Sequence, residues 1–63
     1  MKFSLCKQER DNEGGIIAGK EIETYESNIM LAPGMEIKGK TGRKYRIRCV
    51  DSLPDGTNKA IVE

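Results

Sequence analysis

Residues 43–50 read Arg43-Lys44-Tyr45-Arg46-Ile47-Arg48-Cys49-Val50. Apolar and basic side chains alternate along this stretch, so that Tyr45, Ile47 and Cys49 share one face. A period of two places successive side chains on opposite faces of a β-strand, whereas a helix repeats every 3.6 residues. The stretch therefore predicts a half-buried strand with Tyr45, Ile47 and Cys49 in the core and a basic outer face.

Turn signals divide the rest of the chain at intervals that suit strands. Pro33-Gly34 fits a type II turn, and residues 53–56, Leu-Pro-Asp-Gly, fit a type I turn closed by a left-handed glycine. Residues 12–15 predict a hairpin turn, and Gly19 a β-bulge. The expected fold is all-β: a small antiparallel meander of about five strands at residues 2–10, 16–26, 35–38, 43–50 and 59–62, forming a curled sheet or a small barrel.

One segment, residues 18–32, also fits a helix. Its apolar residues fall three and four positions apart, as on one helical stripe: Ala18, Ile22, Tyr25, Ile29 and Ala32. Thr24, Ser27 and Asn28 are modest helix formers, which favours a strand. The alternative to the all-β fold is thus an α+β fold with one helix near 18–32.

The length of 63 residues predicts one small domain, 1–63, with a thin core. The two cysteines, Cys6 and Cys49, lack the paired spacing of a zinc site, and the chain has no histidine. A disulfide between them is left open. The start of the chain turns polar at once and holds no signal peptide or membrane span, so we expect a cytoplasmic protein.

The net charge of +1 hides an uneven distribution. Residues 1–36 carry four basic and seven acidic side chains, and residues 37–63 carry seven basic and three acidic ones. Either the surface is bipolar, or acidic strands lie beside basic ones as cross-strand pairs. We favour the second interpretation, because neighbouring strands of opposite charge are common in sheets.

The basic side chains of residues 38–48 form the most suggestive candidate binding surface. Closely spaced lysines and arginines neutralise phosphates, but they are also typical of a solvated strand. Binders of single-stranded nucleic acid add exposed aromatic rings, and this chain has only Phe3, Tyr25 and Tyr45. The candidate surface consists of Lys38, Lys40, Arg43, Lys44, Arg46 and Arg48.

No catalytic, cofactor or metal site is expected. Residues 34–41 satisfy the phosphate-loop pattern, but a Pro-Gly turn precedes them and a β segment follows, where a phosphate loop enters a helix. The carboxylates do not suggest an acid–base pair, because no nucleophile lies at a suitable spacing from Glu21, Glu23 and Glu26. Without a histidine, Cys49 is better explained as a buried core residue than as a nucleophile.

The order of turns and strands over about the last 30 residues is similar to that of small SH3-like barrels, a fold that by itself implies no function. Two classes of function follow from the residues. The first is a non-catalytic binding or adaptor module that acts through protein–protein contacts or self-association, and residues 31–35 form either its exposed docking loop or the base of the barrel. The alternative is a nucleic-acid-binding barrel that uses the basic strand 38–48.

Overall fold

The computed structural model describes residues 1–63 and contains five strands and no helix. The all-β prediction is confirmed, and the helix near 18–32 is wrong: residues 18–26 lie in a strand and residues 27–32 in the loop that follows it, with Ile22 and Ile29 exposed. There is consequently no helix that could cross a membrane. The strands are β1 Lys2–Arg10, β2 Ile16–Glu26, β3 Glu36–Lys38, β4 Lys44–Ser52 and β5 Asn58–Val62.

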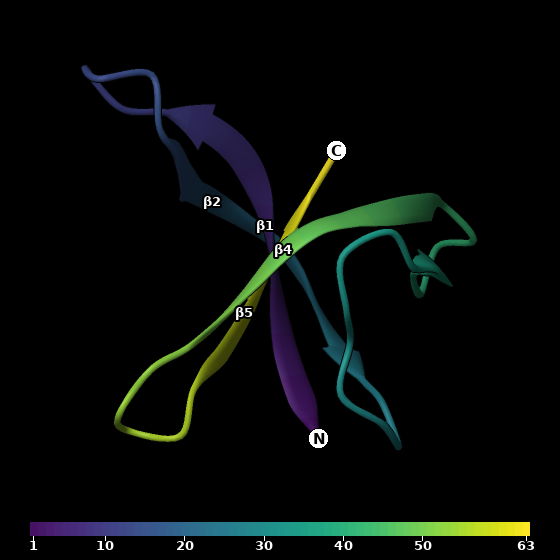
Figure 1. The fold of residues 1–63 in the computed structure, drawn as a ribbon. Helices are drawn as coiled ribbons and strands as arrows, with labels where there is room; N and C mark the ends of the chain where they lie inside the picture. Colours follow the sequence, from purple (N-terminus) through teal and green to yellow (C-terminus); the bar gives the residue numbers. More distant parts are fainter.

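The strands form one mixed sheet in the order β2-β1-β5-β4-β3 (Figure 1). The predicted antiparallel meander is wrong in one connection, because β5 inserts between β4 and β1 and pairs with β1 in parallel. The other three pairings are antiparallel. The sheet does not close into a barrel, since β2 and β3 each have an unpaired edge.

The main core cluster lies on one face of the strongly twisted sheet, and Cys6 and Ile61 are buried on the other face. At the centre of the cluster Leu5 of β1 lies opposite Ala60 of β5, and Ile47 of β4 lies opposite Val62 of β5. Tyr45 is buried, as its phase in the alternation predicted. The core cluster consists of Phe3, Leu5, Leu31, Ile37, Tyr45, Ile47, Ala60 and Val62.

The predicted turns supply the reversals between strands. Gly34 follows Pro33 with φ of 91°, and Gly56 follows Asp55 with φ of 90°. A side chain rarely adopts such positive φ values, so glycine is the residue that lets the chain reverse tightly at both places. Both turns are therefore determined by residues that are adjacent in the sequence.

The two cysteines lie on either side of the central strand. A register shift at Arg48 interrupts the alternation of β4, so Val50 takes the core position and Cys49 turns to the opposite face, where it faces Ile61. The prediction that Cys49 shares a face with Tyr45 and Ile47 is therefore wrong. Cys6 faces Ile61 from the other side, which separates the two thiol-bearing strands by two strand spacings, about 9–10 Å. Both thiols are free, because a disulfide needs Cα atoms within about 7 Å.

The outer half of the β1–β2 hairpin, residues 7–20, projects from the body of the sheet as an arm (Figure 1, upper left). The register between β1 and β2 shifts twice where the arm begins: Ile22 is an extra residue, and both Gly19 and Lys20 lie opposite Lys7. The predicted irregularity at Gly19 is confirmed. Such shifts bend and twist a strand, which directs the arm away from the core.

Opposite charges do face each other across neighbouring strands, at Lys2 and Glu26, at Glu36 and Arg46, and at Asp51 and Lys59. Lys2 with Glu26 and Asp51 with Lys59 each join residues from the same half of the chain, whereas Glu36 and Arg46 join the two halves where they meet. The acidic strand β2 and the basic strand β4 do not face each other, because β1 and β5 lie between them in the sheet.

Candidate functional site

The six basic residues predicted as a binding surface are all exposed, and all belong to the β3–β4 hairpin or its continuation. Three of them already have partners. The Arg46 guanidinium lies 3.3 Å from the Glu36 carboxylate, and the Arg43 guanidinium lies 5.5 Å from the centroid of the Tyr45 ring. The Lys40 ammonium donates a hydrogen bond to the Thr24 hydroxyl over 3.4 Å.

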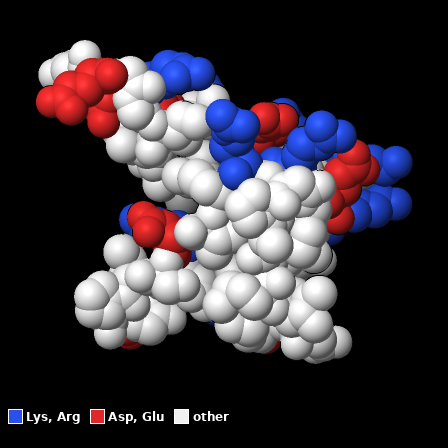
Figure 2. All heavy atoms as spheres, viewed as in Figure 1, with Lys and Arg blue, Asp and Glu red and all other residues white.

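The remaining basic side chains include a like-charged pair. Lys38 and Lys44 lie directly opposite each other across the hairpin, an arrangement that destabilises a sheet. Neither lysine forms an ion pair with a carboxylate. Figure 2 shows Lys and Arg gathered over this hairpin at the right of the molecule, with acidic atoms among them. The hairpin therefore presents positive charge with only local neutralisation.

No exposed aromatic ring lies beside the basic side chains of the β3–β4 hairpin. Phe3 and Tyr45 are buried in the core, and Tyr25 is half-buried and packs against it. Stacking of bases requires an exposed ring face. The basic hairpin can therefore attract phosphate groups but offers no platform on which bases would stack.

The carboxylate of Glu23 joins β2 to the β3–β4 hairpin across the open side of the sheet. It accepts hydrogen bonds from the Lys40 amide over 3.0 Å and from the Tyr45 hydroxyl over 3.0 Å. Burial and the bond to Glu23 raise the pKa of Tyr45 above its ordinary value. Gly39 permits this approach, because a Cβ atom there would lie 2.7 Å from the Glu23 oxygens. We call these two hydrogen bonds the Glu23 bridge. The sequence did not predict it, because the spacing of Glu23 and Tyr45 in the chain does not indicate that they meet.

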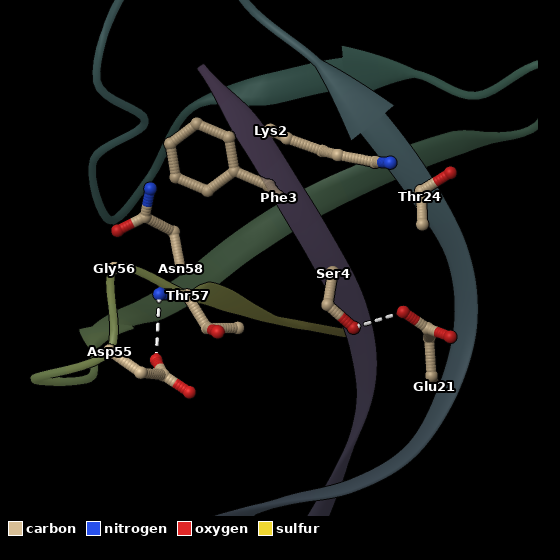
Figure 3. Close-up of a pocket in the computed structure, with 9 residues that line it drawn as sticks. All are labelled: Lys2, Phe3, Ser4, Glu21, Thr24, Asp55, Gly56, Thr57 and Asn58. Atoms are coloured by element: carbon tan, nitrogen blue, oxygen red, sulfur yellow. Dashed lines mark hydrogen bonds between the residues drawn. The ribbon is translucent and has the colours of Figure 1, made fainter.

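A polar hollow of about 340 Å³ lies between the start of β1, the middle of β2 and the β4–β5 turn (Figure 3). The Ser4 hydroxyl donates a hydrogen bond to the Glu21 carboxylate, and Asp55 accepts one from the Thr57 amide over 2.9 Å. The bond from Thr57 holds the pKa of Asp55 below its ordinary value. These groups can bind a small polar molecule by hydrogen bonds, but a carboxylate is a weak base for activating a serine.

A surface without charged side chains covers the opposite end of the molecule from the arm; we call Met1 together with residues 27–35 the uncharged end. Its one charged group is the Met1 ammonium, which lies 3.4 Å from the Glu26 carboxylate. Residues 27–35 form the longest run in the chain without a charged residue. Ile29, Met30 and Met1 are 60%, 49% and 46% exposed. Figure 2 shows this region as the white lobe at the lower right.

The uncharged end is fixed to the core despite its exposure. Leu31 is buried in the core cluster, and the Gly34 amide donates to the Ile47 carbonyl over 2.8 Å. The Ser27 amide donates to the Met1 carbonyl over 2.8 Å. Within residues 31–35, Leu31 is buried in the core while Ala32 faces solvent, and there is no barrel whose base the segment could close.

The phosphate-loop pattern forms a turn at Gly34, strand β3 and a second turn at residues 39–42. No helix N-terminus follows it, so the backbone amides that hold phosphates in such loops are not assembled. No protein family, characterised protein or solved structure matches the chain. The surfaces described above therefore carry the inference of function.

Proposed function

We propose that this protein is a non-catalytic binding or adaptor module that acts through protein–protein contacts, with the uncharged end as its docking surface. The observation that carries the proposal is the exposure of Met1, Ile29 and Met30 together on a surface without charged side chains. The centres of protein interfaces are depleted in charged residues, and methionine is among the residues enriched in interfaces.

The fixed position of this loop supports the proposal further. Because Leu31 is held in the core, Ile29 and Met30 are displayed in one arrangement, and little freedom is lost when a partner covers them. Burying an Ile or Met side chain fully contributes about 1.5–3 kcal/mol. Half-exposed side chains contribute less, so a partner would have to contact several of them at once.

A matched pair of variants tests this function. The protein is immobilised and exposed to an extract of its native host, and the retained proteins are quantified by mass spectrometry. We expect the double variant Ile29→Lys/Met30→Lys to lose the specifically retained partner. Ile22→Lys, which makes the same change at an exposed isoleucine of β2 outside the uncharged end, should keep it. Equal retention by all three proteins would contradict the proposal.

Nucleic-acid binding is the second candidate function, and the unneutralised pair Lys38 and Lys44 favours it. Charge without stacking gives loose attachment, so we expect DNA and RNA to retain the protein only weakly at about 150 mM salt. Sub-micromolar binding that weakens steeply with salt would reverse the order of the two functions. In that case replacing Lys44, Arg46 and Arg48 with glutamine should flatten the salt dependence by about one unit of slope for each lost phosphate contact.

We also propose a fold relationship and a location for the protein. The relationship is to small SH3-like barrels, and it rests on the order of turns and strands over about the last 30 residues. A cytoplasmic location is proposed because thiols stay reduced there, and both cysteines of this chain are free.

A further inference from the structure

The two edges of the sheet differ in how well they are protected from pairing with another strand. The β3 edge is short, and two of its three residues, Glu36 and Lys38, are charged. Short length and charge are devices that block edge-to-edge association. The β2 edge is longer, and only part of it carries such protection.

The second half of the β2 edge is obstructed. Glu21, Glu23 and Glu26 place charge on it, and the register shifts at Ile22 and at Gly19 and Lys20 bend the strand where this half begins. Lys40 of the β3–β4 turn lies against Glu23 and Thr24. Added strands require a straight, open row of backbone groups, so this half is closed to pairing.

Residues 16–19, Ile-Ile-Ala-Gly, form the unprotected part of the edge. They carry no charge and no proline, and they lie on the arm, which stands clear of the body of the sheet (Figure 1). Ile17 is exposed, although β-branched residues favour the interior of sheets. The backbone groups on the outer side of this segment have no partner strand in the protein.

We propose that residues 16–19 pair with the same residues of a second copy of this chain, as antiparallel strands. The charges at the two ends of the segment argue for this partner and this direction. Glu13 precedes the segment and Lys20 follows it, and neither forms an ion pair within the chain. Glu21, the next residue, accepts a hydrogen bond from the Ser4 hydroxyl of its own chain. Antiparallel pairing brings Lys20 of each copy toward the Glu13 end of the other, whereas parallel pairing would bring like charges together.

The pairing joins two two-stranded arms into one four-stranded sheet. A two-stranded hairpin alone is only marginally stable in water, and additional strands stabilise it. Ile16 and Ile17 face opposite sides of the arm, so both faces of the joined sheet gain apolar contacts across the strands. The contact is small, so the dimer should form in a concentration-dependent manner, over roughly 10 µM to 1 mM.

Charge reversal tests the proposal in the full chain. Sedimentation equilibrium of the wild-type protein should show dimers that increase with concentration. Glu13→Lys and Lys20→Glu should each shift the dimerisation midpoint to at least about tenfold higher concentration, since each places like charges together. The double variant Glu13→Lys/Lys20→Glu should restore dimers, because the opposite pairs are re-formed with the signs exchanged. Glu63→Lys changes the net charge as Glu13→Lys does and should leave dimerisation unchanged.

Circular dichroism of each variant shows whether it is folded, and all the altered side chains are exposed. A protein that is monomeric at millimolar concentration overturns the proposal, as does a dimer that is insensitive to both single reversals. A dimer that is lost in Ile29→Lys/Met30→Lys but kept in both reversals assigns self-association to the uncharged end instead. This inference does not depend on the proposed function, because capture of a host protein and dimerisation are measured separately.

Discussion

Strand β1 passes through two different environments within nine residues. Its first part, with Phe3, Leu5 and Cys6, lies between β2 and β5 and is buried. Its last part, Glu9 and Arg10, pairs only with β2 in the arm and is exposed. The strand and its partner β2 are the same in both places, so the difference comes from the neighbour on the other side.

This comparison shows what makes a segment of this small protein rigid. In the centre, β5 is buried on both faces, since Ala60, Ile61 and Val62 are all buried. In the arm no residue is fully buried. A hydrogen-bonded ladder is present in both regions, so apolar burial rather than backbone pairing should separate their stabilities.

The largest expected difference is between two isoleucine-to-aspartate substitutions. Ile47→Asp places an unpaired carboxylate in the core and should cost about 3–5 kcal/mol, as much as a domain of this size has to lose. Ile17→Asp alters an exposed side chain of the arm and should change the free energy of unfolding by about 0.5 kcal/mol or less. Circular dichroism during urea titration measures both. A folded Ile47→Asp protein would show that the core tolerates charge and would remove the contrast.

Amide hydrogen exchange should show the same contrast without mutation. We expect the hydrogen-bonded amides of residues 60–62 to exchange only through global unfolding. Those of residues 8–10 should exchange at least about tenfold faster through local opening of the arm. The measurement is made by NMR at low protein concentration, where the arm is unpaired. Equal protection in the two regions would mean that the arm unfolds together with the core.

A smaller effect is expected at the Glu23 bridge, which lies where β2 leaves the arm and rejoins the body. Tyr45→Phe removes the hydrogen bond to Glu23 and should lower the free energy of unfolding by about 1 kcal/mol. Tyr25→Phe is the matched control, because the Tyr25 hydroxyl makes no hydrogen bond in the structure and its removal should have little effect. Urea denaturation distinguishes the two, and equal losses would refute the role of the bridge.

The smallest effects are expected from pH. The pKa of Asp55 is lowered in the folded protein, so its contribution to stability is present at neutral pH and is lost as the pH falls below about 4. The pKa of Tyr45 is raised, so its contribution is lost as the pH rises above about 10. Asp55→Asn should remove the acid slope only, and Tyr45→Phe the alkaline slope only. Melting temperatures across the pH range show whether each slope follows its own residue.

The local signals in the sequence located the strands well. Alternation placed Tyr45 and Ile47 in the core, and the proline–glycine and aspartate–glycine steps marked turns that the structure contains. Strands β1 and β2 begin and end where the alternation and the glycines predicted. These features depend on residues close together in the chain, which is why local patterns carry them.

The features that were missed depend on contacts between distant residues. Nothing near residues 58–62 indicates that they insert between β4 and β1. No glycine marks the register shift at Arg48, which turns Cys49 away from the core. Within the candidate surface, the alternation predicted the exposure of the basic residues but not the pairing of Arg46 with Glu36 or the approach of Arg43 to Tyr45.

The central position of β5 has a consequence for the way the chain folds as it is made. Residues 58–62 supply the strand that separates β1 from β4, so the two hairpins emerging earlier from the ribosome have nothing to pack between them. Long-range pairing of this kind is slow, since a loop spanning most of the chain must close before the contacts form. The β1–β2 and β3–β4 hairpins should therefore wait as marginal, separate units, and the protein should reach its native state only after β5 has left the exit tunnel.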